Sequence, residues 1–212
     1  MGVLKKFLID YLTYTSAVSD ALVLKKKDFH SINMYGIEGL NFHRQYVNKP
    51  FQVQVFYAPT NFIIPEHEHP NVDSYEVYIG GDVAFSHTGT WLRWDGKKYE
   101  FVNDLFVVNV KHNDIHGAYM GPEGGIFMSV QHWINDVDPS CVSEDYDGGA
   151  LCNNHSDDWG LPYNKEMTPL DAAHKENRAI MWEEIEHKSW ECIKPNPSKF
   201  EGLPSPTQYF NK

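Results

Sequence analysis

The residues best suited to chemistry lie in one short stretch, where two histidines are followed by a carboxylate. His67 and His69 stand two positions apart, directly after the run 61–64, and Glu76 follows seven positions later. Alternate residues of a β-strand point to the same face, so both imidazole rings can converge on one point. On a helix the same spacing would turn the rings apart. Neutral imidazoles and a carboxylate bind divalent transition metals, so this stretch is a candidate metal site.

A simpler interpretation is that His67 and His69 belong to an exposed turn of alternating acidic and basic residues with no function. A lone His-x-His pair would favour that interpretation. Here a carboxylate follows, and a third histidine, His116, stands at the start of a later strand-like run. Three histidines and one carboxylate on strand-like segments move the balance to a metal site.

Strand-like runs rich in β-branched and aromatic residues fill the chain from about residue 29 to residue 135. Turn signals separate them, among which Asp95 and Gly96 mark the clearest hairpin. Many short strands with regular turns are typical of a sandwich, barrel or jelly roll, and without an internal repeat we expect one barrel. The predicted strands are 30–35, 51–57, 62–65, 75–79, 83–87, 91–94, 98–102, 105–110, 117–120 and 126–134.

A strand-rich chain with His-x-His, a following Glu and a later His resembles the cupin superfamily. The resemblance covers roughly residues 45–135. In cupins the first motif supplies two histidines and a glutamate, the second supplies one histidine, and all four meet inside a small jelly-roll barrel. The resemblance therefore implies a cupin barrel that holds a metal with His67, His69, Glu76 and His116.

The two motifs depart from the usual cupin spacing and framing. Six residues separate His69 from Glu76, where cupins usually have three or four, so Asp73 competes for the role of carboxylate ligand. We prefer Glu76, because it lies in a strand followed by glycines and Asp73 would fall in a turn. In the second motif, 111–113 replaces the usual Pro-x-Gly turn, and Asn113 can take the left-handed conformation that such a turn needs.

The other histidines near the motifs are expected to be structural. His112 lies in a loop, where it should face solvent or support a ligand. His87 and His132 lie in predicted strands, where a lone histidine is usually a hydrogen-bonded core or surface residue. The sequence does not decide whether the His132 face or the Gln131 face of that strand points inward.

The segment before the barrel reads as a helix. Apolar residues recur at three- and four-residue steps over 3–24, which predicts one helix within an arm of residues 1–28. We expect this arm to pack on the barrel, 29–135, or on a second subunit. The length suits one domain spanning residues 1–212, with terminal helices packed outside an all-β core.

Three further segments follow the predicted barrel. An acidic loop, 136–166, either folds over the barrel mouth or forms a surface excursion. A capped start with an early proline predicts a helix over 167–192. The tail 193–212 is rich in proline and should be extended, and its aromatic end, Tyr209 and Phe210, suggests docking on another surface such as that of a partner subunit.

Composition excludes several classes of function. A formal net charge of -11 argues against a nucleic-acid partner, because phosphate contacts need clustered Lys and Arg. Three cysteines do not form a disulfide framework, and an odd number suits a reducing compartment. Asp10 interrupts the first apolar run, and no stretch is long enough to span a membrane. We therefore expect a cytoplasmic protein with no membrane partner.

The resemblance also implies an activity. Four protein ligands on a six-coordinate metal leave two positions for water, dioxygen or a chelating substrate, which favours an Fe(II) dioxygenase acting on a small organic, possibly aromatic, substrate. Mn, Ni or Zn in the same site would suit a lyase, isomerase or decarboxylase, and a barrel that only binds a small molecule is a further alternative. Tyr78 shares the strand parity of Glu76 and is the predicted pocket residue. We expect a homodimer.

Overall fold

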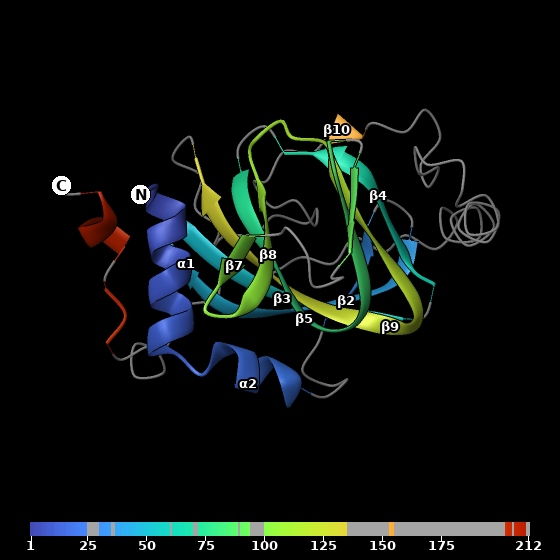
Figure 1. Cartoon of the computed structure of the whole chain (residues 1–212), viewed down its shortest axis with the longest axis horizontal. Coiled ribbons are helices and arrows are strands. Elements are labelled where there is room, and N and C mark those ends of the chain that lie inside the picture. Colours follow the sequence, from blue (N-terminus) through green and yellow to red (C-terminus); the bar gives the residue numbers. More distant parts are fainter. Residues whose placement is uncertain are drawn as a thin grey trace.

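The computed structural model of this protein describes residues 1–24, 30–34, 37–59, 61–69, 72–88, 90–93, 100–134, 153–154, 202–204 and 206–210. Antiparallel strands form most of this part of the chain, and two short helices lie at its amino-terminal end (Figure 1). The predicted all-β jelly roll with helix outside the core is thereby confirmed. The predicted helix over 167–192, the Asp95-Gly96 hairpin and all three cysteines lie outside the described residues.

The helices are α1 (Val3–Tyr14) and α2 (Ala17–Leu22), and a 3-10 turn, η4 (Pro206–Tyr209), lies near the carboxyl end. The strands are β1 (His30–Met34), β2 (Ile37–Asn48), β3 (Phe51–Ala58), β4 (Ile63–Glu68), β5 (Val72–His87), β6 (Thr90–Arg93), β7 (Glu100–Val102), β8 (Leu105–Val110), β9 (His116–Trp133) and β10 (Asn153–Asn154).

Two long strands, β5 and β9, pair from Val72–Trp133 to His87–His116, apart from residues 121–124 of β9, and belong to both layers of the jelly roll. The first half of β5 and the second half of β9 lie between β3 and β8, while their other halves pair with β6 and β4. The prediction of separate strands 75–79 and 83–87, and of separate strands 117–120 and 126–134, is wrong, because β5 and β9 each continue through the intervening glycines. The register shifts there, between Tyr78 and Gly80 and between Gly81 and Val83, so the glycines bend the ladder without ending it.

Gly81 explains why glycine stands at this bend. Its φ is 79°, a conformation that other residues rarely adopt, and an added Cβ would lie 2.5 Å from the carbonyl oxygen of Gly124. The two long strands therefore approach so closely at the bend that the backbone excludes a side chain.

Strand β2 is missing from the prediction, although it pairs with both β1 and β3. Its alternation of apolar and polar residues is broken by a register shift between Arg44 and Tyr46. Within this irregularity Gln45 is buried, accepts a hydrogen bond from the Tyr11 hydroxyl at 3.0 Å and donates to the Ala17 carbonyl at 2.8 Å. Buried polar residues in a bulged strand leave no two-residue apolar period to read.

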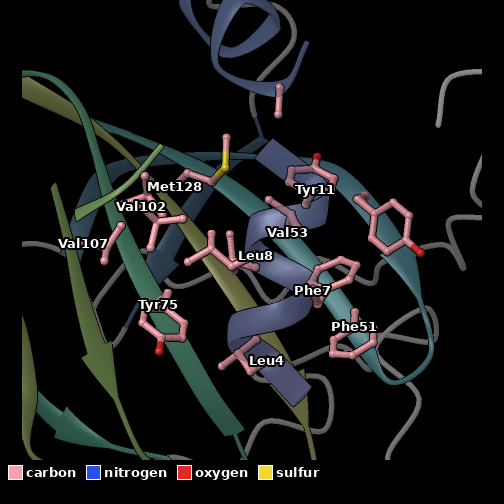
Figure 2. Packing of buried hydrophobic residues seen from close by; sticks show 14 of the residues in the cluster. Leu4, Phe7, Leu8, Tyr11, Phe51, Val53, Tyr75, Val102, Val107 and Met128 are labelled. Carbon is pink, nitrogen blue, oxygen red and sulfur yellow. The ribbon is translucent and has the colours of Figure 1, made fainter. Parts of the chain in front are cut away.

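Helix α1 covers one face of the sheet formed by β3, β9 and β5 (Figure 1). Figure 2 shows Phe7 and Leu8 of the helix pointing into a cluster that includes Phe51 and Met128 of the strands. The Phe7 and Phe51 rings stack with centroids 4.0 Å apart. We call this the outer face of the sheet.

The single helix predicted over 3–24 is wrong, because it breaks at Thr15 and Ser16 into α1 and α2. Thr15 has an extended backbone, with φ -124° and ψ 159°, and its hydroxyl donates back to the Tyr11 carbonyl at 2.5 Å. Ser and Thr compete in this way with the helical hydrogen-bond ladder, which the apolar periodicity alone does not reveal.

The aromatic end of the tail docks on this same chain. Tyr209 is buried, with its ring 5.6 Å from that of Phe7 and 5.4 Å from that of Phe51. Phe210 lies 6.0 Å from Phe51. The predicted docking therefore takes place on α1 and β3, and a contact with a partner subunit stays a prediction. In the described ranges, no helix has both the length and the apolar character needed to cross a membrane.

Candidate metal centre

The opposite face of the sheet, which we call the inner face, lines a cavity of about 60 Å³. Its polar wall includes His69, which directly follows β4, Glu76 of β5 and His116 at the start of β9. The two sequence motifs therefore meet at one cavity, although 40 residues of numbering separate Glu76 from His116. The apolar wall consists of Phe56, Ile64, Phe85, Ala118 and Phe127.

The loop of the second motif holds the first motif in place. The Asn113 backbone N–H donates to the His69 carbonyl at 3.0 Å, and the His69 and His116 rings have centroids 5.3 Å apart. Asn113 has a φ of 64°, the left-handed conformation predicted for this turn. An Asn in that conformation lets the loop fold back onto His69 and brings both rings to the cavity.

His116 is prepared to act as an uncharged nitrogen donor. Burial, and secondarily the charges of His69 and His87, lower its pKa to about 3, against the raising effect of a hydrogen bond to the backbone of Asp114. That bond joins His116 Nδ1 to the Asp114 carbonyl oxygen at 2.8 Å. A carbonyl only accepts, so Nδ1 carries the proton and Nε2 keeps its lone pair. This is the tautomer that a metal ligand needs.

Glu76 is a buried carboxyl group that is held by one of its oxygens. Ser74 donates to Oε1 at 2.6 Å and Ser129 donates to the same oxygen at 2.9 Å. Within the described residues, Oε2 has no hydrogen-bond partner. Burial raises the pKa of Glu76 to about 7, although both serine hydroxyls act to lower it. One oxygen thus fixes the side chain and the other remains available on the cavity wall.

For His67 the structure describes only the backbone, which lies in β4. It is the register partner of His116 across β4 and β9, and His87 is the partner of His116 on the other side, in β5. The three histidine positions therefore stand in register across β4, β9 and β5. Asn154 of β10 pairs with His67, so this short piece of the acidic loop joins the sheet edge next to the motif.

The described side chains fit a metal in chemistry and bring part of the predicted ligand set together. Two imidazoles that bind one ion about 2.1 Å from each nitrogen have ring centres roughly 4.5–5.5 Å apart, which the His69–His116 separation of 5.3 Å satisfies. Among the side chains that the structure describes, no three His, Cys, Asp or Glu groups converge closely enough to form a metal cluster. The complete set of His67, His69, Glu76 and His116 therefore stays a prediction.

The competing carboxylate, Asp73, lies away from the cavity. It is paired in register with His132 of the outer face, and its Oδ1 accepts hydrogen bonds from the backbone N–H and ring Nδ1 of His112, both at 2.8 Å. Burial acts to raise the pKa of Asp73, but these hydrogen bonds and the Lys111 charge lower it overall. Asp73 anchors the second-motif loop, while Glu76 lines the cavity.

The remaining predicted residues take distinct places. His87 Nε2 lies 2.9 Å from the Asp114 carboxylate, so it supports the loop before His116. The His132 ring lies on the outer face, 5.4 Å from Phe51. Tyr78 packs against the inner apolar cluster, but its hydroxyl donates to the Gly81 carbonyl at 2.8 Å, and Tyr78 is not among the described residues that line the cavity.

Sequence reasoning missed the polar residues that surround Glu76. Ser74, Ser129 and Gln131 line the cavity, and Gln131 Nε2 donates to the Ser129 hydroxyl at 3.2 Å. Strand parity could have found Ser74, which is two residues before Glu76. The sequence shows that Ser129 and Gln131 share one face of their strand, but it does not show that this face points inward.

Comparisons with known proteins give only distant structural matches. No family model and no curated protein matches the chain. Among solved structures, the DMSP lyase DddQ from Ruegeria pomeroyi matches with a TM-score of 0.42 and 17% identity over 58% of this chain and 64% of that chain. An RmlC-like cupin from Shewanella frigidimarina matches with a TM-score of 0.38 and 18% identity, over 53% of this chain and 91% of that chain. KdgF from a Halomonas species matches with a TM-score of 0.37 and 15% identity, over 46% of this chain and 82% of that chain. At these scores the likeness is coarse, and assignment of the jelly roll rests on the strand pairing of this chain itself.

Proposed function

We propose that this cupin-type jelly roll is a metal-dependent enzyme for a small organic substrate, with His67, His69, Glu76 and His116 as metal ligands. The observation that carries the proposal is the meeting of His69, Glu76 and His116 on one cavity whose other walls are largely apolar. Neutral imidazoles and a carboxylate in such a cavity suit Fe(II), Mn, Ni or Zn. Binding would draw on His67, the register partner of His116, and on rotation of the His69 or Glu76 side chain.

The favoured activity is that of an Fe(II) dioxygenase. When bound, a ferrous ion would supply the redox chemistry and the open coordination positions for oxygen and substrate. The protein's own part is to bind, orient and exclude water. Phe56, Phe85 and Phe127 form an aromatic wall that can pack against an organic substrate, and the Ser74 and Ser129 hydroxyls orient the Glu76 carboxylate.

A redox-neutral lyase, isomerase or decarboxylase is the second candidate, and Glu76 favours it. A buried carboxyl group whose pKa is raised to about 7 is protonated and unprotonated in similar amounts near neutral pH. Such a group suits the transfer of a proton to or from a substrate carbon or oxygen. In this alternative Glu76 acts as general acid or base, and the histidines hold Mn, Ni or Zn.

Oxygen consumption distinguishes the two candidates. The full chain would be loaded anaerobically with Fe(II), or with Zn(II) as the control, and tested against small aromatic and aliphatic acids while oxygen uptake and product are followed together. Oxygen uptake that requires both iron and one acid supports the dioxygenase. Product formation without oxygen uptake supports the redox-neutral enzyme. Failure of any tested metal to bind leaves only the alternative of a non-enzymatic binding barrel and contradicts the proposal.

The expected location and assembly remain part of the same proposal. A cytoplasmic location rests on the odd number of cysteines, and a homodimer on the terminal segments that extend beyond the barrel. Sedimentation of the full chain tests the dimer, since a monomer at all concentrations would contradict it.

A further inference from the structure

A second, smaller cavity of about 20 Å³ lies beside the candidate metal centre. His69, Val72 and Gln131 line both cavities, so the two spaces share a wall. The rest of this side cavity is polar and is formed by the inner faces of β2 and β3 and by the end of β9. The residues that add to the shared wall are Arg44, Gln52, Gln54 and Trp133.

Arg44 brings a permanent positive charge to the side cavity. It is only 8% exposed and is the register partner of Gln54 across β2 and β3. A guanidinium group does not lose its proton in proteins, so Arg44 keeps its positive charge on the wall of this small space. Planar carboxylates match the fork of guanidinium N–H donors, and charge-assisted hydrogen bonds of this kind are stronger than neutral ones.

The neighbouring amides are fixed by a hydrogen-bond network. Gln131 accepts at Oε1 from Gln52 Nε2 at 3.0 Å and from the Trp133 indole at 2.8 Å, and it donates from Nε2 to Gln54 Oε1 at 3.1 Å. With its further bond to Ser129, Gln131 uses both donors and both acceptor positions. Its orientation is therefore determined.

This arrangement leaves one donor and one acceptor on the wall of the side cavity. Gln54 is buried and accepts through Oε1, and in the described part of the chain its Nε2 has no partner. Gln52 Oε1 is buried and likewise lacks a described partner. The Gln54 amide can add a hydrogen bond to a carboxylate beside Arg44, while the Gln52 oxygen suits a water molecule or a donor group on the ligand.

The same network connects the side cavity to the candidate metal centre. From Gln131 it runs through the Ser129 hydroxyl to Glu76 Oε1, over distances of 3.2 Å and 2.9 Å. A ligand group held by Arg44 and Gln54 is therefore placed at a fixed position relative to the Glu76 carboxylate. This suits a site that binds one end of a molecule and presents the other end for reaction.

We infer that the side cavity binds the carboxylate of a small organic acid, whose carbon portion lies in the larger cavity beside His69 and His116. The side cavity of about 20 Å³ holds roughly one or two water-sized groups, and the larger cavity of about 60 Å³ holds roughly four or five. The acid therefore has on the order of five to seven non-hydrogen atoms. The chemistry at the far end rests on the proposed function, whereas carboxylate recognition needs only Arg44 and the amides.

Butyrate and butyramide are matched probes for this inference, because they have equal numbers of non-hydrogen atoms and differ in charge. Their dissociation constants would be measured by calorimetry on the full chain as purified, at constant ionic strength. We expect butyrate to bind roughly 10- to 100-fold more tightly than butyramide, as charge-assisted hydrogen bonds require. Equal affinities, or no binding of butyrate at 50 mM, would overturn the inference.

Two variants locate the effect. Arg44→Gln should weaken butyrate by roughly 10- to 100-fold and leave butyramide unchanged, with folding verified by circular dichroism. Gln54→Glu keeps the buried arginine and places a carboxylate next to it, so it should also abolish the preference for butyrate. If both folded variants bind butyrate as the unaltered protein does, the side cavity is not the carboxylate site.

Removal of metal separates this inference from the proposed function. Metal content is measured on the same samples, before and after treatment with a chelator. Because Arg44 is not a proposed metal ligand, the preference for butyrate should survive chelation. A preference that is lost with the metal and is insensitive to Arg44→Gln would assign carboxylate binding to the metal and overturn the inference, while leaving the proposed metal centre intact. If the protein contains no metal and still prefers butyrate, the proposed metal centre is contradicted and the inference about carboxylate binding stands.

Discussion

The two faces of the sheet formed by β3, β9 and β5 are built from alternate residues of the same strands and differ in chemistry around Glu76. On the outer face, Val53, Val77 and Val130 pack with α1 into a continuous apolar cluster. On the inner face, the buried Glu76 and the partly buried Gln131 belong instead to a hydrogen-bonded polar layer. A substitution on one face should therefore change a different property from a substitution on the other.

The difference is one of free energy. Apolar burial stabilises by about 25 cal/mol per Å² of surface removed from water, which is what the outer face supplies. Buried polar groups cost free energy unless they are hydrogen-bonded, and even then contribute little net stability. The polar layer of the inner face therefore adds little to folding for the number of groups that it contains, whereas the apolar part of that face, which includes Phe56 and Phe127, does stabilise the fold. The arrangement of the polar layer is explained better by ligand binding.

The largest effect on stability is expected on the outer face. Phe7→Ala should lower the free energy of unfolding by about 3–5 kcal/mol, because Phe7 is fully buried and stacks on Phe51. Denaturant unfolding measures the change. Tyr14→Ala on the same helix, where the side chain is 54% exposed, should stay within about 0.5 kcal/mol. A loss below about 1 kcal/mol for Phe7→Ala would show that α1 is not an integral part of the core.

On the inner face the expected loss is in metal affinity. Ser129→Ala removes one of the two hydroxyls that hold Glu76 Oε1 and should weaken metal binding by about 10- to 100-fold, as measured by competition with a chelator. Ser86→Ala is the matched control, because Ser86 is also buried and donates to a different carboxylate, Glu66. If both variants weaken the metal equally, the Ser129 contact is not specific to the site.

The smallest effect is expected at the outer-face carboxylate, Asp73. The lowered pKa of Asp73 means that its contribution to stability is present above the ordinary value of 3.8 and is lost as the pH falls through the lowered value. Because the pair with His112 is partly exposed, Asp73→Asn should cost below about 1 kcal/mol at pH 7, and the difference should shrink by pH 3. Unfolding at the two pH values measures this.

Asp73→Asn also sharpens the choice between the two carboxylates. It should leave metal content unchanged, whereas Glu76→Gln should lower it, because Glu76 lines the cavity and Asp73 binds the second-motif loop. The opposite result would exchange the two roles.

The sequence was sufficient for those features that depend on spacing. The two-residue period of β3 and β8 predicted a strand-rich barrel, and the resemblance carried by the two histidine motifs predicted that His69 and His116 meet inside it. What spacing cannot reveal is a strand that carries buried polar groups. Buried Arg44 and Gln45 interrupt the apolar period of β2, which is why this strand was not predicted. Arg44 is also the residue on which the proposed carboxylate recognition depends.

The glycines of β5 led to a wrong strand boundary for a related reason. Gly80 and Gly81 are turn residues by composition, yet here they bend β5 where it passes from one sheet to the other. Whether a glycine ends a strand or bends it is determined by its partner strand, in this case by β9 at Gly124, which lies more than 40 positions away in the sequence. A local pattern does not contain that information.

The most direct test of the metal centre uses two histidines of one strand, His116 on the inner face of β9 and His132 on the outer face. Elemental analysis would be carried out on the protein as purified anaerobically, on His116→Ala and on His132→Ala. We predict about one metal ion per chain in the protein and in His132→Ala, and its loss in His116→Ala. Equal metal content in the two variants, or none in any of the three proteins, would contradict the assignment of the inner-face cavity as a metal centre.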